Sequence, residues 1–214
     1  MLYGSYKLGN ADIYSHQLSS GTRQIVARYP GSNMSPAVSP DGKKVAMILS
    51  KGGSPDLYVC DIDGGNLRQL TRTREEEASP CWSPDGRTIC FSSASSGAVA
   101  LYRISANGGS AVPLRTAGLP RCTEPDWSPD GKFIVFTSQA GNNFTLCLAK
   151  ADGSDALSLG VEGEDPSWAP NSRAVIFVRH RNHNSILSLL DVPTKQVKDV
   201  ARVLESNSQP SWAK

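Results

Sequence analysis

Apolar residues along the chain occur in short runs rather than in long stretches or at helical spacing. Runs such as "KVAMIL", "TICFSS", "FIVFTS" and "AVIFVR" are rich in β-branched and aromatic residues, and turn-forming Gly, Pro, Asn, Asp or Ser residues bound them. No segment has the 3.6-residue period of an amphipathic helix. The pattern therefore predicts an all-β protein built from short strands.

A repeat organises these runs. The segment "PAVSPDG" recurs as "PCWSPDG", "PDWSPDG", "PSWAPNS" and a terminal "PSWAK". The residues that mark the repeat are 44, 45, 41 and 44 positions apart, and they are Val38, Trp82, Trp127, Trp168 and Trp212. A period of this length is typical of a β-propeller blade with four strands, named A to D here. Pro-Asp-Gly predicts a tight turn between strands A and B.

The two ends of the chain complement each other in this arrangement. Residues 1–28 supply strands B, C and D, with Tyr3 aligned to Phe91, Phe136 and Phe177, whereas residues 208–213 supply a strand A alone. We therefore predict one all-β domain over 1–214: a five-bladed β-propeller of four-stranded antiparallel blades, whose ring closes when the C-terminal strand pairs with the N-terminal strands. The predicted blades are 1–28 plus 208–213, 35–72, 79–116, 124–161 and 165–204.

Composition narrows the class of protein. The chain has 214 residues, of which 39% are hydrophobic and 20% charged, as in a folded globular protein. A net charge of +2 gives no reason to expect a nucleic-acid partner. No apolar run reaches the roughly 18 residues that cross a bilayer, so we expect no membrane insertion. The first ten residues, "MLYGSYKLGN", lack the features of a signal peptide. We expect a monomer, with a strand-swapped dimer as the alternative, because a terminal strand A can detach.

Five cysteines do not suggest a disulfide framework, because their number is odd and none are closely paired. Four fall in predicted strands and are expected to be buried small hydrophobes: Cys60, Cys81, Cys90 and Cys147. Cys122 falls in a predicted loop and is expected to be the most reactive thiol.

Catalytic motifs are absent from the sequence. It contains no Gly-x-Ser-x-Gly elbow, no phosphate-binding Gly-rich loop and no His-Glu-x-x-His pair. Asp41, Asp85 and Asp130 occupy matching positions, but the repeat places them on separate turns, too far apart to share an ion. We therefore expect a protein that is not an enzyme and needs no cofactor.

Loops between strands D and A, and between B and C, are expected to form one face of a propeller and to bind any partner. The residue before each strand-A proline should lie near the mouth of the central channel, and these are Ser35, Ser79, Glu124, Asp165 and Gln209. Glu124 and Asp165 come from adjacent blades. They are interpreted as a cation site, as a contact for a basic partner, or simply as a hydrated rim.

Other charged residues in these loops are further candidates for partner binding. Arg74, Glu75, Glu76 and Glu77 lie in "TRTREEEAS", which is either a solvated loop with local ion pairs or a charged rim that steers a partner. Arg121 lies in the next loop of this kind. His180, Arg181 and His183 lie in "RHRNHNS", a predicted hairpin loop where His-x-x-His has no fixed geometry for a metal, so a basic, pH-sensitive contact patch is favoured.

The repeat resembles that of the TolB-like β-propellers. Pro-x-Trp-Ser-Pro-Asp-Gly, a strand B ending in Phe-x-Ser, and Leu-Tyr-x-x-Asp-x-Asp-Gly carry the resemblance, and "SPAVSPDGKKVAMILSKGGSPDLYVCDIDGGNLRQLT" (35–71) is especially similar. The terminal Pro-Ser-Trp-Ala is also similar to the end of TolB. Two features differ from that family. TolB proteins typically have six blades and an N-terminal α/β domain, whereas this sequence contains repeats for five blades and no segment that resembles such a domain.

The resemblance implies a periplasmic adaptor of the cell envelope whose propeller binds a peptidoglycan-associated lipoprotein. Peptidase-associated propellers and some lyases use the same repeat, and such lyases hold a metal in a His-rich centre. The alternatives are therefore a metal-dependent carbohydrate-active enzyme, or a stand-alone or engineered structural propeller without a ligand.

Overall fold

The computed structural model describes residues 1–7, 9–94, 97–181, 184–200 and 209–212, and every regular element among them is a β-strand. The first sheet has three strands: β1 (Leu2–Ser5), β2 (Asp12–His16) and β3 (Arg23–Ala27). Four four-stranded sheets follow. The second contains β4 (Asn33–Val38), β5 (Lys44–Leu49), β6 (Asp56–Asp61) and β7 (Arg68–Gln69), and the third contains β8 (Glu77–Trp82), β9 (Thr88–Ser93), β10 (Ala100–Ser105) and β11 (Val112–Pro113).

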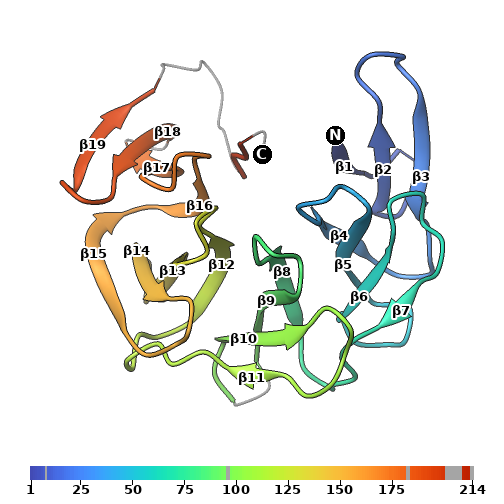
Figure 1. Ribbon diagram of the computed structural model, residues 1–214, viewed down its shortest axis with the longest axis horizontal. Coiled ribbons are helices and arrows are strands. Elements are labelled where there is room, and N and C mark those ends of the chain that lie inside the picture. The colour runs from blue at the N-terminus through green and yellow to red at the C-terminus, as the bar shows by residue number, and fades with distance from the viewer. Residues whose placement is uncertain (8, 95–96, 182–183, 201–208, 213–214) are drawn as a thin grey trace.

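The last two sheets repeat this plan. They contain β12 (Cys122–Trp127), β13 (Phe133–Ala140), β14 (Asn143–Lys150) and β15 (Ala156–Glu162), then β16 (Glu164–Trp168), β17 (Ala174–Arg181), β18 (Asn184–Asp191) and β19 (Gln196–Asp199). All pairings are antiparallel between consecutive strands. Figure 1 shows the sheets side by side around a common centre, with β4, β8, β12 and β16 innermost. The predicted all-β blade architecture is confirmed.

Ring closure is not seen in the described residues. The first sheet lacks the innermost strand that the other four have, and β1 pairs with β2 alone. Residues 209–212 follow the last blade and belong to none of the five sheets. Figure 1 shows the N-terminus and this C-terminal piece on the two sides of the ring's open part. The structure is therefore an arc of five blades, one of them three-stranded.

The Ser-Pro-Asp-Gly segments form the turns from strand A to strand B, as predicted. In the third blade the carboxylate of Asp85 accepts hydrogen bonds from the Ser83 hydroxyl (2.6 Å) and the Arg87 amide (3.0 Å). Ser83 in turn accepts a hydrogen bond from the amide of Thr88 at 2.9 Å. Gly86 has a φ of 68°, which a glycine adopts without steric cost. The same bonds recur around Asp41 and Asp130, so these carboxylates stabilise turns.

A β-bulge at the start of each strand A was not predicted. The pairing register shifts within β4, β8, β12 and β16 around the residue that precedes the proline. That residue has a positive φ of 50–53° in the four blades that have a strand A and at the C-terminus: Ser35, Ser79, Glu124, Asp165 and Gln209. Positive φ is uncommon for residues other than glycine. The bulge turns the start of each inner strand and fixes where these five side chains project.

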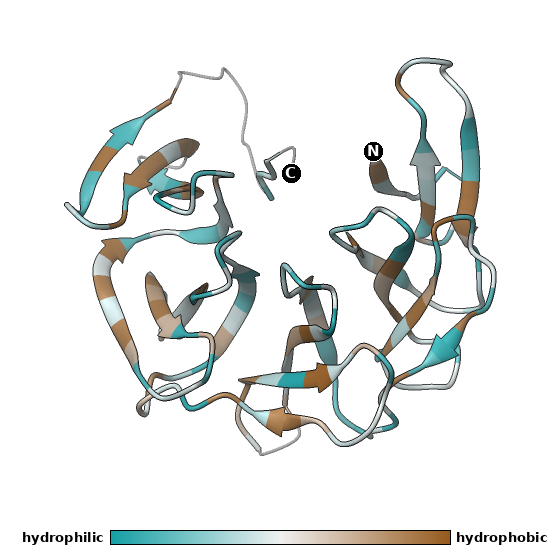
Figure 2. Ribbon diagram, viewed as in Figure 1, coloured by the Kyte–Doolittle hydropathy of each residue, from teal (hydrophilic) through white to brown (hydrophobic). Residues whose placement is uncertain are grey.

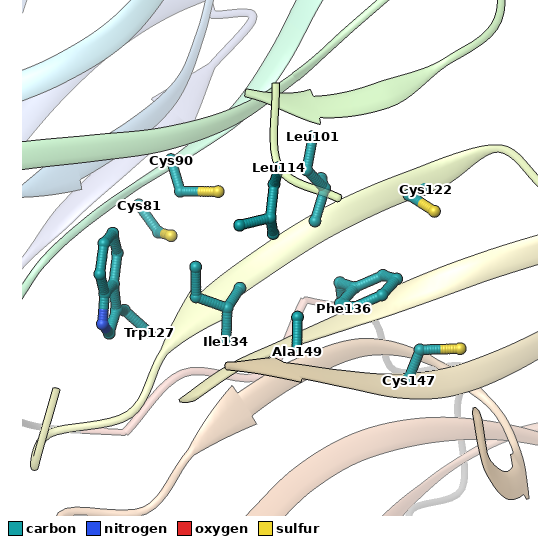
Figure 3. Close-up of a cluster of buried hydrophobic side chains, with 10 residues drawn as sticks. All are labelled: Cys81, Cys90, Leu101, Leu114, Cys122, Trp127, Ile134, Phe136, Cys147 and Ala149. Atoms are coloured by element: carbon teal, nitrogen blue, oxygen red, sulfur yellow. The ribbon is translucent and has the colours of Figure 1, made fainter. Parts of the chain in front are cut away.

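The core lies between neighbouring blades. Figure 2 shows the apolar residues concentrated on the strands, and the connecting loops are mostly hydrophilic. Trp127 of one blade packs with Cys81, Cys90 and Leu101 of the preceding blade, and Figure 3 shows this cluster. Tyr3 stacks on Tyr14 at 5.7 Å between ring centroids, just as Phe91 stacks on Tyr102 at 6.0 Å, so the alignment of the first blade is confirmed.

The predictions for the cysteines were partly wrong. Cys60, Cys81, Cys90 and Cys147 are buried in strands, as predicted. Cys122, however, is the first residue of β12 and is fully buried, with its Sγ 3.4 Å from the carbonyl oxygen of Leu119. Burial also raises its pKa, which lowers the thiolate fraction. The prediction of a reactive loop thiol is therefore not supported.

Two outer strands are shorter than their sequences suggested. β7 and β11 contain two residues each. In the second blade the side-chain hydroxyl of Thr71, rather than a backbone carbonyl of strand D, accepts a hydrogen bond from the amide of Leu57 at 2.8 Å. The chain leaves the sheet at this point and begins the loop to the next blade.

Candidate protein-binding face

The blades have two ends with different chemistry. We call the end that carries the B–C and D–A loops the loop face, and the end that carries the A–B and C–D turns the turn face. Strand A begins at the loop face and ends at the turn face. Of the ten residues proposed from the sequence as partner contacts, the nine that the structure describes belong to segments of the loop face.

Carboxylates at the start of strand A connect neighbouring blades. Glu124 accepts hydrogen bonds through Oε2 from the Thr137 hydroxyl (2.7 Å) and from the backbone amide of Asp165 in the next blade (2.9 Å). Asp165 repeats this contact, because its Oδ2 accepts a hydrogen bond from the amide of Gln209 at 2.9 Å. Glu124 and Asp165 are therefore in contact across adjacent blades. They meet through a carboxylate-to-amide chain that runs from blade to blade.

The environment of these carboxylates disfavours ionisation. Burial raises the pKa of Glu124, and the negative charges of Asp165 and Glu164 add to this effect, although the two hydrogen bonds oppose it. Burial also raises the pKa of Asp165, with Glu164 acting in the same direction. The inner edge of the loop face therefore concentrates acidic groups in a partly dehydrated setting.

Glu164 joins this acidic group and was missed by the sequence analysis. Its Oε1 lies 2.5 Å from Nε2 of His180, whose Nδ1 lies 3.3 Å from the hydroxyl of Ser185. His180 was predicted on a hairpin loop, but it lies within β17 and is half-exposed. Only the position of Glu164, one residue before Asp165, could have signalled this pair.

The other residues of the predicted basic patch are placed differently. Arg181 is the last residue of β17 rather than a loop residue, and it forms an exposed ion pair with Asp199 at 3.5 Å. Arg179 contacts the same carboxylate at 3.4 Å. His183 lies outside the described residues. Arg121 is exposed, and its Nε donates a hydrogen bond to Oε1 of Gln139 at 3.1 Å.

Glu77 does not belong to an exposed charged loop, contrary to the prediction. It is 2% exposed and is the first residue of β8. Its carboxylate accepts hydrogen bonds from the hydroxyls of Thr71 and Thr73 and from the amide of Leu57. Burial raises its pKa, and the nearby charge of Asp56 acts in the same direction. Glu77 therefore anchors the D–A loop to the underlying blade.

Asp56 completes this anchor and was also missed. It is 4% exposed, and its carboxylate accepts hydrogen bonds from the Thr73 amide (3.0 Å) and the Gln69 side chain (2.9 Å). The only sign of this role in the sequence was the order Asp-Leu-Tyr at the start of strand C, which was interpreted as part of the strand and nothing more.

The exposed charges of the same loop surround a hollow. Arg74, Glu75 and Glu76 are exposed, and Arg74 and Glu76 line a hollow of about 530 Å³ together with Gly52, Gly53, Ser54, Pro55 and Thr73. The hollow thus lies between a B–C loop and a D–A loop of one blade. Thr73, which also lines the hollow, is hydrogen-bonded to Asp56 and Glu77. These bonds hold the charged loop against the underlying blade.

Two kinds of feature do not occur among the described residues: a cluster of metal-ligating side chains and a membrane-spanning helix. Across the chain's described ranges, no three His, Cys, Asp or Glu side chains are grouped closely enough to hold a metal ion. Within the same residues there is no helix long and apolar enough to cross a membrane.

The blade repeat and its arc define a β-propeller class of protein. Within that class, the family described as TolB beta propeller domain matches residues 1–214, and the chain belongs to this family. It is 40% identical over 52 residues to the Tol-Pal system protein TolB of Francisella tularensis subsp. tularensis (strain WY96-3418), a match that covers 24% of this chain and 12% of that protein.

Solved structures support the same fold. TolB from Acinetobacter baumannii superposes with a TM-score of 0.85 at 24% identity, over 99% of this chain and 54% of that one. A putative TolB from Agrobacterium tumefaciens gives a TM-score of 0.78 at 22% identity, over 88% and 73%. The chain thus spans about half the length of the first of these structures and a much smaller part of the curated relative.

Proposed function

We propose that this propeller is a non-enzymatic protein-binding module that acts in a Tol-Pal system as TolB does. By resemblance it works in the periplasm and binds a peptidoglycan-associated lipoprotein. The loop face and the acidic channel mouth make the contact, and no cofactor takes part.

One observation carries this proposal: the loop face holds exposed charges above buried, hydrogen-bonded carboxylates. Arg74, Glu75 and Glu76 are exposed, whereas Glu77 directly beneath them is buried and hydrogen-bonded. A preorganised charged rim suits protein recognition because little conformational entropy is lost on binding. It also steers an oppositely charged partner and raises the association rate.

We also propose that the ring closes through residues 209–212 and β1. The first sheet lacks a strand A, and the C-terminal segment has the φ of a strand-A start at Gln209 together with its bond to Asp165. In the monomer, pairing of the two would supply the absent strand and cover the open edge of β1. Hydrogen exchange of the backbone amides tests this proposal. Closure should slow exchange in β1, and truncation after residue 207 should restore fast exchange. Both results should be the same at every protein concentration.

The binding proposal is tested by titration calorimetry with the soluble domain of a peptidoglycan-associated lipoprotein. We expect micromolar or tighter binding. Reversing two exposed rim charges, Glu75→Lys with Glu76→Lys, should weaken binding at least tenfold at low salt, and added salt should reduce the difference from the parent because it screens these charges. The matched control is Asp155→Lys on the turn face, where a similarly exposed carboxylate pairs with Lys150 at 3.6 Å.

The control variant should change the affinity by less than twofold. Absence of binding by the parent protein at several temperatures would contradict the adaptor role. Equal weakening by the rim and control variants would contradict the assignment of the loop face.

A further inference from the structure

The turn face has a hollow where one blade departs from the repeat. Strand A of each blade ends in a residue directly before the turn, and in three blades this residue is tryptophan. Val38 pairs with Val45 at this position, just as Trp82 pairs with Ile89 and Trp127 pairs with Ile134. The backbone is therefore equivalent, and only the size of the side chain differs.

Each tryptophan fills the space between its own blade and the preceding one. Trp82 packs with Ile48, Leu57 and Val59, and it is 7% exposed. Trp127 is also 7% exposed and Trp168 is 1% exposed. Indole is thus the group that the spacing of these blades accommodates.

Val38 leaves this space open. It is 44% exposed, and a hollow of about 300 Å³ lies beside it, with Met1, Leu2 and Ile62 as its other apolar lining residues. An apolar cavity of roughly 150 Å³ is large enough for benzene. The hollow therefore has room for a bicyclic aromatic ring.

The remaining lining residues fit a neutral aromatic group with one donor. They carry no carboxylate, lysine or arginine, and they are Ser15, His16, Gln17, Thr22 and Gln24. In the repeat the indole N–H of Trp82 donates to the Ala37 carbonyl at 2.9 Å. Amide and hydroxyl oxygens here offer the same kind of acceptor to an incoming indole.

We propose that this hollow is a docking site for a tryptophan side chain presented by a partner polypeptide. The exposure of Val38 (44%) and Ile62 (37%) makes the hollow too open to enclose a small molecule, since ligand pockets bury most of their ligand. An open apolar socket suits a single aromatic anchor of a protein interface. The site lies on the turn face and is independent of the loop-face contact proposed above.

The experiment is an amide and methyl NMR titration with a short tryptophan-containing peptide, with free indole in a parallel arm. We expect saturable shifts at Leu2, Val38 and Ile62 with the peptide, and weaker binding of indole. Val38→Trp fills the hollow from within as the other blades do, so it should abolish the shifts and keep or raise the melting temperature. Val38→Ala enlarges the hollow and should keep the binding.

Three results would overturn the proposal. The first is the absence of saturable shifts with the peptide at millimolar concentration. The second is unchanged peptide binding by the Val38→Trp variant. The third is binding of free indole without binding of the peptide, which would make the hollow a small-molecule site. If the Val38→Trp variant fails to fold, a peptide with alanine in place of tryptophan provides the test. Loss of binding by this peptide would support the proposal, and unchanged binding would overturn it.

Discussion

The two ends of strand A carry the same carboxylate chemistry in opposite environments. At the turn face, hydrogen bonds from Ser83 and from the Arg87 amide lower the pKa of the exposed Asp85. At the loop face, burial raises the pKa of Glu77 and of Glu124 despite two or more hydrogen bonds to each. The turn carboxylate thus stabilises the fold in its ionised form, whereas burial of Glu77 and Glu124 makes their ionised forms less favourable. Raised carboxylate pKa values are common at functional sites, so this difference is consistent with the loop-face contact that we propose.

The largest expected effect comes from removing the Glu77 anchor. Glu77→Ala removes the buried carboxylate that accepts from the Thr71 and Thr73 hydroxyls, while the Leu57 amide keeps its shorter bond to the Thr71 hydroxyl. We expect a loss of about 2–3 kcal/mol in the free energy of unfolding, measured by urea denaturation. Glu76→Ala is the control and should stay within about 0.5 kcal/mol of the parent. Equal effects of the two substitutions would show that Glu77 is not an anchor.

Removing a turn carboxylate should cost less. Asp85→Ala removes the acceptor for the Ser83 hydroxyl and the Arg87 amide, and we expect a loss of about 1 kcal/mol in thermal or urea unfolding. Asp155→Ala removes only an exposed pair with Lys150 at 3.6 Å and should have almost no effect. A loss at Asp85 larger than that at Glu77 would reverse the comparison between the two faces.

A matched pair of amide substitutions tests the two environments by pH. Glu124 and Asp85 each accept two hydrogen bonds through one oxygen, so glutamine and asparagine can keep those bonds. Asn171 already accepts from the amides of Arg173 and Ala174 at the equivalent turn of the last blade. The substitutions therefore change mainly the ability to ionise.

The two variants should respond to pH in opposite directions. Because the folded-state pKa of Glu124 is raised, its ionisation destabilises the parent protein above that pKa. Glu124→Gln should therefore be more stable than the parent at neutral pH. This difference in stability should disappear as the pH falls from the raised pKa to the ordinary one. Because the pKa of Asp85 is lowered, its ionised form stabilises the parent above the ordinary value, and the deficit of Asp85→Asn disappears as pH falls through the lowered value. Melting temperatures from pH 3 to 8 measure both, and parallel profiles would contradict the account.

The smallest expected effect concerns the bond between Asp165 and the C-terminal segment. Asp165→Ala removes the acceptor of the Gln209 amide. We expect faster hydrogen exchange at Gln209 with little change in the global unfolding free energy, because one local bond is lost at the chain end. Glu124→Ala should instead speed exchange at Asp165, whose amide it binds. If Gln209 exchanged equally fast in the parent, the bond would have no role in holding the segment.

The repeat could be predicted from the sequence because its residues act locally. Pro-Asp-Gly specifies a tight turn wherever it occurs, and the alternation of the strands positions Trp82 and Phe91 in the core. The left-handed conformation of Glu124 and Asp165 could not be predicted, because glycine is the residue usually found with positive φ and a residue before proline usually adopts extended backbone.

The candidate site was predicted only in part, for a related reason. The charges of "TRTREEEAS" are equivalent in sequence, yet Glu77 is buried while Glu75 and Glu76 are exposed. What separates them is contact with Thr71 and Leu57, which depends on how the loop folds back onto strand C. His180 was wrongly placed in a loop because β17 and β18 extend further than the apolar run that predicted them. Long-range contacts, rather than local pattern, decide both cases.

The most direct test of the central claim is a hydrogen-exchange footprint of the complex with the soluble domain of a peptidoglycan-associated lipoprotein. The account predicts protection of loop-face peptides around 73–77 and 119–124, with no change at the turn-face peptides 83–87 and 128–132. Protection of the turns without protection of the loops would contradict it.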